Sequence, residues 1–94
     1  MAPELVKKQE YDYELVDVWA LGVLFYALIT GLFPFKGASN REMFGKIVKG
    51  NYVIPERIQI GPKRLIIKML QVNPEHRTYL RNLSGIKNHN VLII

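Results

Sequence analysis

Uncharged residues, most of them apolar, fill one continuous stretch of the chain, residues 18–35, which follows directly after Asp17. Gly31 suits the position after a helix and Pro34 follows shortly, so we expect a helix over about residues 17–31. One stripe at helical spacing consists of Val18, Leu21, Leu24, Phe25, Leu28 and Ile29. Further apolar residues lie outside this stripe and leave little polar face. A helix that is apolar nearly all round is typical of one surrounded by protein.

Three interpretations compete for this stretch: a membrane span, an ordinary core helix, and a core helix whose start is bonded to another segment. A helix from Asp17 to Gly31 leaves about 14 helical residues, or about 21 Å. A hydrocarbon core is about 30 Å thick, so we predict no membrane span. Asp17 at the start can accept a hydrogen bond from a free amide of the first turn. This cap is expected under both core-helix interpretations, so it does not decide between them.

A second helix is predicted from a capping box at residues 39–42. Ser39 can bond forward to an amide of the first turn, while Glu42 can reach back toward the cap. Gly50 suits the position after the last turn, so the helix covers about residues 40–49. Its apolar residues fall on one side and its lysines on the other. The apolar set is Met43, Phe44, Ile47 and Val48.

The remaining pattern predicts more helix and no long repeat. Residues 51–60 form a loop, and Pro62 suits the first turn of the next helix. The inward stripe of that helix is Leu65, Ile66, Met69 and Leu70. Asn73 and Pro74 indicate a cap and a first-turn proline. A last short helix would use Leu80, Leu83 and Ile86. We therefore expect an all-α fold of about four helices around the buried apolar helix.

Length and charge limit the function. A chain of 94 residues makes one small domain, and the absence of cysteine excludes disulfides and thiolate metal sites. The net charge is +5, but no basic run exceeds two residues, whereas nucleic-acid binders concentrate such charge. His76 and His89 are too far apart for a local metal motif. We expect no nucleic acid as partner, and the N-terminus does not resemble a signal peptide.

Four short motifs occur in one order along residues 2–83, and their combination resembles the C-terminal lobe of a eukaryotic protein kinase. They are Ala2-Pro3-Glu4, Asp17-Val18-Trp19 with Gly22, Pro34-Phe35, and Asn73-Pro74 with Arg77. Ala-Pro-Glu ends the activation segment in that family. The stretches "APELVKKQEYD", "GNYVIP" and "MLQVNPEHR" are similar to those of the AMP-activated and microtubule-affinity-regulating serine/threonine kinases.

The resemblance implies roles for several residues. Asp17 would bind backbone amides of a catalytic loop, and Trp19 would pack beneath the activation segment. Gly22 would permit the close approach of a neighbouring element. Glu4 would form an ion pair with Arg77, and such a buried pair is costly to break because the surviving charge is stranded.

The helix over about residues 40–49 matches a kinase segment that often contacts substrates and regulatory partners. Met43, Phe44, Ile47 and Val48 are therefore possible docking residues, although a packing role is the stronger expectation for an apolar helical stripe. Any of the four that is exposed would be a contact for a protein partner.

The motifs that carry phosphoryl transfer are absent from this sequence. That reaction needs a Gly-rich phosphate cover, a strand lysine, a catalytic-loop Asp and Asn, and a metal-binding Asp. We therefore predict no catalytic, cofactor-binding or metal-binding residue in this chain, although the resemblance implies ATP and Mg²⁺ for the complete family. The chain is expected to be inactive alone. An interaction module and a small membrane-associated protein remain as alternative functions.

Two departures from the kinase pattern lie late in the chain. Tyr79 stands where the family commonly has a Thr, and residues 84–94 form a divergent tail with an apolar end. Since Met1 directly precedes Ala-Pro-Glu, we infer that residues 1–94 are a partial kinase domain. Such a piece would leave an apolar strip uncovered between Val18 and Ile29, so we expect marginal stability and self-association. The resemblance implies a cytoplasmic or nuclear location.

Overall fold

A computed structural model describes residues 1–79 of the chain. Its helices are α1 (Pro3–Val6), α2 (Tyr13–Thr30), α3 (Asn40–Lys49) and α4 (Ile60–Met69), followed by a 3₁₀ turn at Pro74–His76. No strand occurs within these residues, which confirms the predicted all-α class. The expected last helix with Leu80, Leu83 and Ile86 lies outside the described residues, as does the 84–94 tail.

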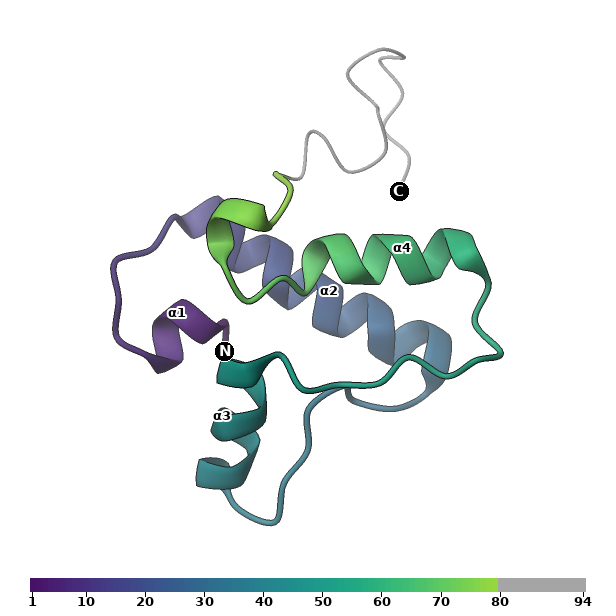
Figure 1. The fold of residues 1–94 in the computed structure, drawn as a ribbon, viewed down its shortest axis with the longest axis horizontal. Coiled ribbons are helices and arrows are strands. Elements are labelled where there is room, and N and C mark those ends of the chain that lie inside the picture. The colour runs from purple at the N-terminus through teal and green to yellow at the C-terminus, as the bar shows by residue number, and fades with distance from the viewer. Residues whose placement is uncertain (80–94) are drawn as a thin grey trace.

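The helices pack in two pairs (Figure 1). α2 and α4 lie side by side, and the short α1 packs against α3. Between the pairs lies one cluster of buried side chains. It comprises Ala2, Trp19, Tyr26, Phe35, Ile47, Ile66 and Leu70. At its centre the rings of Trp19 and Phe35 stack with centroids 5.5 Å apart, so the apolar helix and the loop after it form one core.

α2 begins four residues earlier than predicted. Asp12 is its N-cap, and the Asp12 carboxylate accepts hydrogen bonds from the amides of Glu14 and Leu15 at 2.8 and 3.4 Å. Asp17 therefore lies in the second turn, and its expected capping role is wrong. An Asp placed before an acidic first turn is a strong cap, and that signal was present at Asp12. The predicted end is confirmed, since Gly31 closes the helix with φ +76°.

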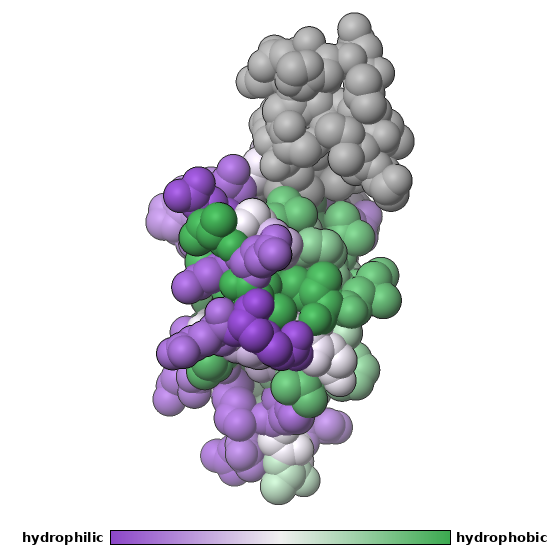
Figure 2. Space-filling model, turned by 90° about the vertical axis from the view of Figure 1, so that its right-hand side faces the viewer, coloured by the Kyte–Doolittle hydropathy of each residue, from purple (hydrophilic) through white to green (hydrophobic). Residues whose placement is uncertain are grey.

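The predicted apolar stripe of α2 is only partly buried, and part of it forms the uncovered strip expected between Val18 and Ile29. The residues that face the core are Leu15, Val18, Trp19, Gly22, Tyr26 and Thr30. Leu21, Leu24 and Leu28, by contrast, are 40%, 54% and 74% exposed. A helix that is apolar on every side carries no periodic signal to show which face packs. Figure 2 shows apolar residues gathered on one side of the protein.

The length argument against a membrane span does not hold. The 18 residues of α2 extend about 27 Å, and this helix is long and apolar enough to cross a membrane by length and composition. A core helix meets the same criterion, and the inner face of α2 builds the core of this protein. Packing, rather than length, therefore argues for a core helix.

The other helix ends follow the sequence closely. The Ser39 hydroxyl accepts from the Glu42 amide at 3.2 Å, and the Glu42 carboxylate accepts from the Ala38 amide at 3.1 Å. The predicted capping box is thus present, with its return bond one residue before the cap. Gly50 ends α3 with φ +65°. On α4, Ile66, Met69 and Leu70 are buried as expected.

Candidate functional site

The most distinctive polar feature is a buried ion pair between the two ends of the described chain. The Arg77 guanidinium donates from its two terminal nitrogens to the two Glu4 carboxylate oxygens, at 2.7 and 3.0 Å. Both side chains are excluded from solvent. Glu4 belongs to α1, whereas Arg77 directly follows the 3₁₀ turn. The ion pair predicted between these residues is therefore present.

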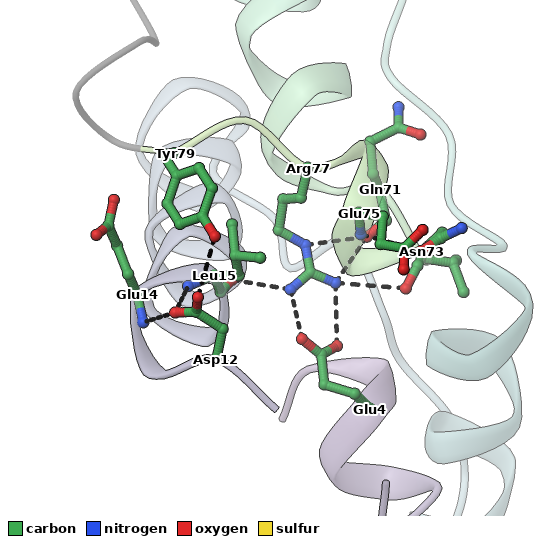
Figure 3. A network of polar contacts seen from close by, with 10 residues as sticks. Glu4, Asp12, Glu14, Leu15, Gln71, Asn73, Glu75, Arg77 and Tyr79 are labelled. Carbon is green, nitrogen blue, oxygen red and sulfur yellow. Dashed lines mark hydrogen bonds and ion pairs between the residues drawn. The ribbon is translucent and has the colours of Figure 1, made fainter. Parts of the chain in front are cut away.

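Arg77 also holds the backbone around it (Figure 3). Its guanidinium donates to the carbonyl of Leu15 in α2 at 2.8 Å and to the carbonyl of Gln71 at 2.7 and 3.0 Å. One residue thus joins α1, α2 and the segment after α4. Because a planar guanidinium presents five donors in a fixed fork, no other side chain satisfies this set of acceptors.

The charge of Glu4 is stabilised in place. Burial of the carboxyl opposes ionisation, but the hydrogen bonds from Arg77 and the positive charge of Arg77 outweigh it. Together they hold the pKa of Glu4 below its ordinary value of 4.5. Glu4 is therefore ionised at neutral pH, and the pair is a true ion pair rather than a neutral hydrogen bond.

Trp19 lies directly beside this pair. The Arg77 guanidinium stands 5.1 Å from the centre of the Trp19 ring, at the distance of a cation–π contact. The indole is 1% exposed, and its Nε1–H finds no acceptor within the described part of the chain. A buried donor without a partner is destabilising.

Gly22 allows α2 to approach α4 closely. A Cβ at Gly22 would lie 2.8 Å from Met69 Cβ and 2.9 Å from Leu70 Cδ2. Both distances are too short for carbon atoms, so only glycine fits here without a shift of α4. The close approach predicted for Gly22 is therefore seen, and α4 is the neighbour.

The expected role of Asp17 is not tested by the described residues. Its side chain is exposed, and no hydrogen bond joins it to another residue within 1–79. The catalytic loop that it would bind is not part of this sequence. Binding of loop amides by Asp17 thus stays a prediction.

Two polar residues of this region were missed by the sequence reasoning. The Tyr79 hydroxyl donates to the second carboxylate oxygen of Asp12 at 3.0 Å, so the cap of α2 is also tied to the segment after Arg77 (Figure 3). The capping signal at Asp12 could have been found from its spacing to Glu14. The contact to Tyr79 spans 67 positions and leaves no local pattern.

The proposed docking residues of α3 lie mostly against the core. Ile47 is buried, and Met43, Phe44 and Val48 are half-buried. Their packing role, which was the stronger expectation, is thus seen, while their docking role stays a prediction. Within residues 1–79, no group of three His, Cys, Asp or Glu residues is placed to hold a metal ion.

The comparisons with known proteins agree with the geometry. Residues 1–92 match the family model of the protein kinase domain, so the chain belongs to the protein kinase family. More particularly, it is similar to serine/threonine kinases. Over 87% of its length it is 42% identical to the probable serine/threonine-protein kinase MARK-A of Dictyostelium discoideum. Over 89% it is 38% identical to the SNF-related serine/threonine-protein kinase of Rattus norvegicus.

More distant kinases match a similar stretch, for example an aurora kinase of Patiria pectinifera, which is 37% identical over 95% of this chain. The chain spans only a small part of each relative: 8% of MARK-A, 11% of the SNF-related kinase and 21% of the aurora kinase. The similarity is thus to one segment of the kinases and not to their whole length.

Proposed function

We propose that this chain acts as the helical base of a serine/threonine kinase catalytic domain. In this role it holds the end of the activation segment in place. The single observation that carries the proposal is the buried Glu4–Arg77 pair, which fixes Ala-Pro-Glu to α2 and to the segment after α4. A bidentate pair with further carbonyl contacts has one geometry, so it sets the position of the segment that ends at Glu4.

The base alone performs no phosphoryl transfer in this proposal. Positioning of the γ-phosphate requires a phosphate cover, a lysine and two metal-binding or catalytic carboxylates, and the sequence has these motifs at no position. A preceding part of the domain would hold ATP and Mg²⁺. This preceding part would hold the phosphate to be transferred close to the base, where the Ser or Thr of a substrate protein would receive it.

Two features of α2 support a covering segment of this kind. The Asp17 carboxylate is exposed, and three leucines of the outer face are exposed. A segment that brings backbone amides to Asp17 and apolar side chains to the leucines would satisfy both. The proposal assigns this role to the catalytic loop and the helix before it.

Two measurements test the proposal. The purified chain is first assayed for ATP binding and for transfer of labelled phosphate to a generic Ser/Thr substrate, and both are expected to be zero. The chain is then co-expressed with the preceding part of the MARK-A catalytic domain. Recovery of ATP-dependent phosphorylation is expected with the wild-type chain and is expected to be lost with Asp17→Ala. The exposed Glu10→Ala is the matched control.

Phosphate transfer by the homogeneous chain alone would contradict its inactivity. Equal recovery with Asp17→Ala and Glu10→Ala would contradict the role of Asp17. The transcript across Met1 gives an independent check, because an upstream stop codon without kinase motifs would remove the preceding part.

The exposed leucines also favour a second candidate, a non-catalytic interaction module that self-associates or binds a kinase through the outer face of α2. An apolar patch of this kind marks a partner site or an aggregation-prone surface. Sedimentation measurements separate this candidate from a small membrane-associated protein, which would instead remain in the membrane pellet after carbonate extraction.

A further inference from the structure

Two adjoining hollows flank the loop of residues 32–36, which links α2 to α3. The larger has a volume of about 490 Å³ and lies between this loop, residues 51–55 and Lys46 of α3. The smaller, of about 260 Å³, lies between the same loop, Trp19 and the apolar side of α3. The two share Phe33, Pro34 and Lys36 as lining residues, so they form one groove across the loop.

The walls of the smaller hollow are mainly apolar, and those of the larger hollow mix apolar and polar residues. Phe33, which lines both hollows, is 66% exposed. Tyr26 and Tyr52 meet edge to face with centroids 6.3 Å apart, and the Tyr26 hydroxyl donates to the Val53 carbonyl at 2.5 Å. Burial and the neighbouring Tyr26 raise the pKa of Tyr52 above its ordinary value. Tyr52 therefore keeps its proton at neutral pH and adds no negative charge to the groove.

The charged residues that line the groove are of one sign. Lys36 and Lys46 line the larger hollow, and among residues 1–79 no Asp or Glu lines either of the two. The Lys46 ammonium lies 3.7 Å from Glu42, and the two side chains are 37% and 51% exposed. Such a partly exposed pair at one-turn spacing is weak, so Lys46 can exchange it for another anion.

We propose that this lysine-flanked groove binds an acidic peptide segment that carries one large apolar anchor residue. The anchor would occupy the hollow beside Phe33 and Pro34, while carboxylates on either side of it would lie near Lys36 and Lys46. An apolar wall supplies the contact area, and charges at its edge set the polarity and register of the partner. A concave site suits an inserted side chain better than a flat lipid surface does.

This proposal is independent of the kinase proposal, because it uses neither Asp17 nor the outer face of α2. The probe is a fluorescein-labelled peptide, Glu-Glu-Asp-Phe-Asp-Glu-Glu, titrated with the full chain in fluorescence polarisation. Saturable binding is expected. Lys36→Gln combined with Lys46→Gln should weaken it about fivefold, since each exposed pair contributes little alone. Phe33→Ala should weaken binding by a comparable factor without a change in melting.

Lys63→Gln combined with Lys68→Gln on α4 is the matched control, because it removes the same charge from exposed positions that do not line the groove. Binding by this control should stay within about twofold of the wild type. Equal weakening by both double variants would overturn the proposal in favour of non-specific attraction. No saturable binding would overturn it as well. Groove-dependent pelleting with phosphatidylserine vesicles, without peptide binding, would replace it by a membrane contact.

Discussion

Two regions of α2 show opposite relations between side-chain chemistry and burial. At its N-terminal half, α2 contacts the Glu4–Arg77 ion pair through the Leu15 carbonyl. The charged Glu4 of this pair, which belongs to α1, is 1% exposed. On the outer face of the same helix Leu28 is 74% exposed. The charge is stable inside because it has a partner and complete hydrogen bonding. The leucine is outside because nothing in the described chain covers it.

The comparison teaches that burial in this chain follows the availability of a partner rather than polarity. The Glu4–Arg77 pair, called the ion-pair anchor from here on, has all its partners within residues 1–79. The exposed leucines on the outer face of α2 have no covering partner within these residues. A surface of this kind is the expected property of an element that is built to be covered by another segment.

The largest effect is expected when the ion-pair anchor is broken. Arg77→Leu should lower the free energy of unfolding by about 3–5 kcal/mol, because it leaves the Glu4 charge buried without a partner. The carbonyls of Leu15 and Gln71 also lose their donor. A loss of this size is comparable with the whole stability of a small domain. Urea unfolding followed by the fluorescence of Trp19 measures it.

The control for this variant is Lys46→Ala, which breaks the exposed pair with Glu42. It should cost less than about 0.5 kcal/mol. If Arg77→Leu costs no more than this control, the contribution assigned to the ion-pair anchor is wrong.

A smaller effect is expected on the inner face of α2. Gly22→Ala should cost about 1–3 kcal/mol, because the added Cβ overpacks against Met69 and Leu70. Gly45→Ala is the matched control within α3, where a Cβ meets no atom within 4 Å. That variant should gain up to about 1 kcal/mol from higher helix propensity. Thermal melting compares the two, and equal shifts would contradict close packing at Gly22.

Acid should weaken the ion-pair anchor more gently than the loss of Arg77. Since the pKa of Glu4 in the folded chain lies below 4.5, its contribution is complete above that pH. It is lost as the pH falls through the folded pKa and the carboxylate takes up a proton. Urea melts between pH 7 and pH 3 should therefore show a steeper decline for the wild type than for Glu4→Gln. Parallel curves would show that Glu4 does not titrate with unfolding.

The smallest effect on stability is expected on the outer face. Leu24→Glu combined with Leu28→Glu should change the free energy of unfolding by less than about 0.5 kcal/mol, as exposed substitutions do. The same change should reduce concentration-dependent association in sedimentation velocity. Leu15→Glu on the inner face is the contrasting control, because Leu15 is 7% exposed and a charge there should unfold the chain. Unfolding by the outer-face pair would show that this face is packed.

Much of the local structure was predictable because its signals are short. The capping box at Ser39, the closing glycines Gly31 and Gly50, and the stripe of α4 each rest on residues within one or two turns. The start of α2 was missed because Asp17, which directly precedes the apolar stretch, was preferred over Asp12 as cap. The inner face of α2 could not be found, since a helix that is apolar on nearly every side has no clear periodic pattern.

The candidate site was predicted only in part, because some of its contacts leave no local sequence signal. Glu4 and Arg77 were paired from motif order, but the Leu15 and Gln71 carbonyls that complete the site have no side-chain signal. The contact between Tyr79 and Asp12 likewise joins residues far apart in the chain.

The sequence by itself determined the helical class, both ends of α3, the C-terminal end of α2 and the family, because caps, glycines and short motifs act through neighbouring residues. The tertiary structure alone decided which face of α2 is buried and which backbone groups receive the Arg77 guanidinium. It also decided where Lys36 and Lys46 meet an apolar groove. These depend on the approach of distant segments, and the energy of each contact exists only once the segments have met.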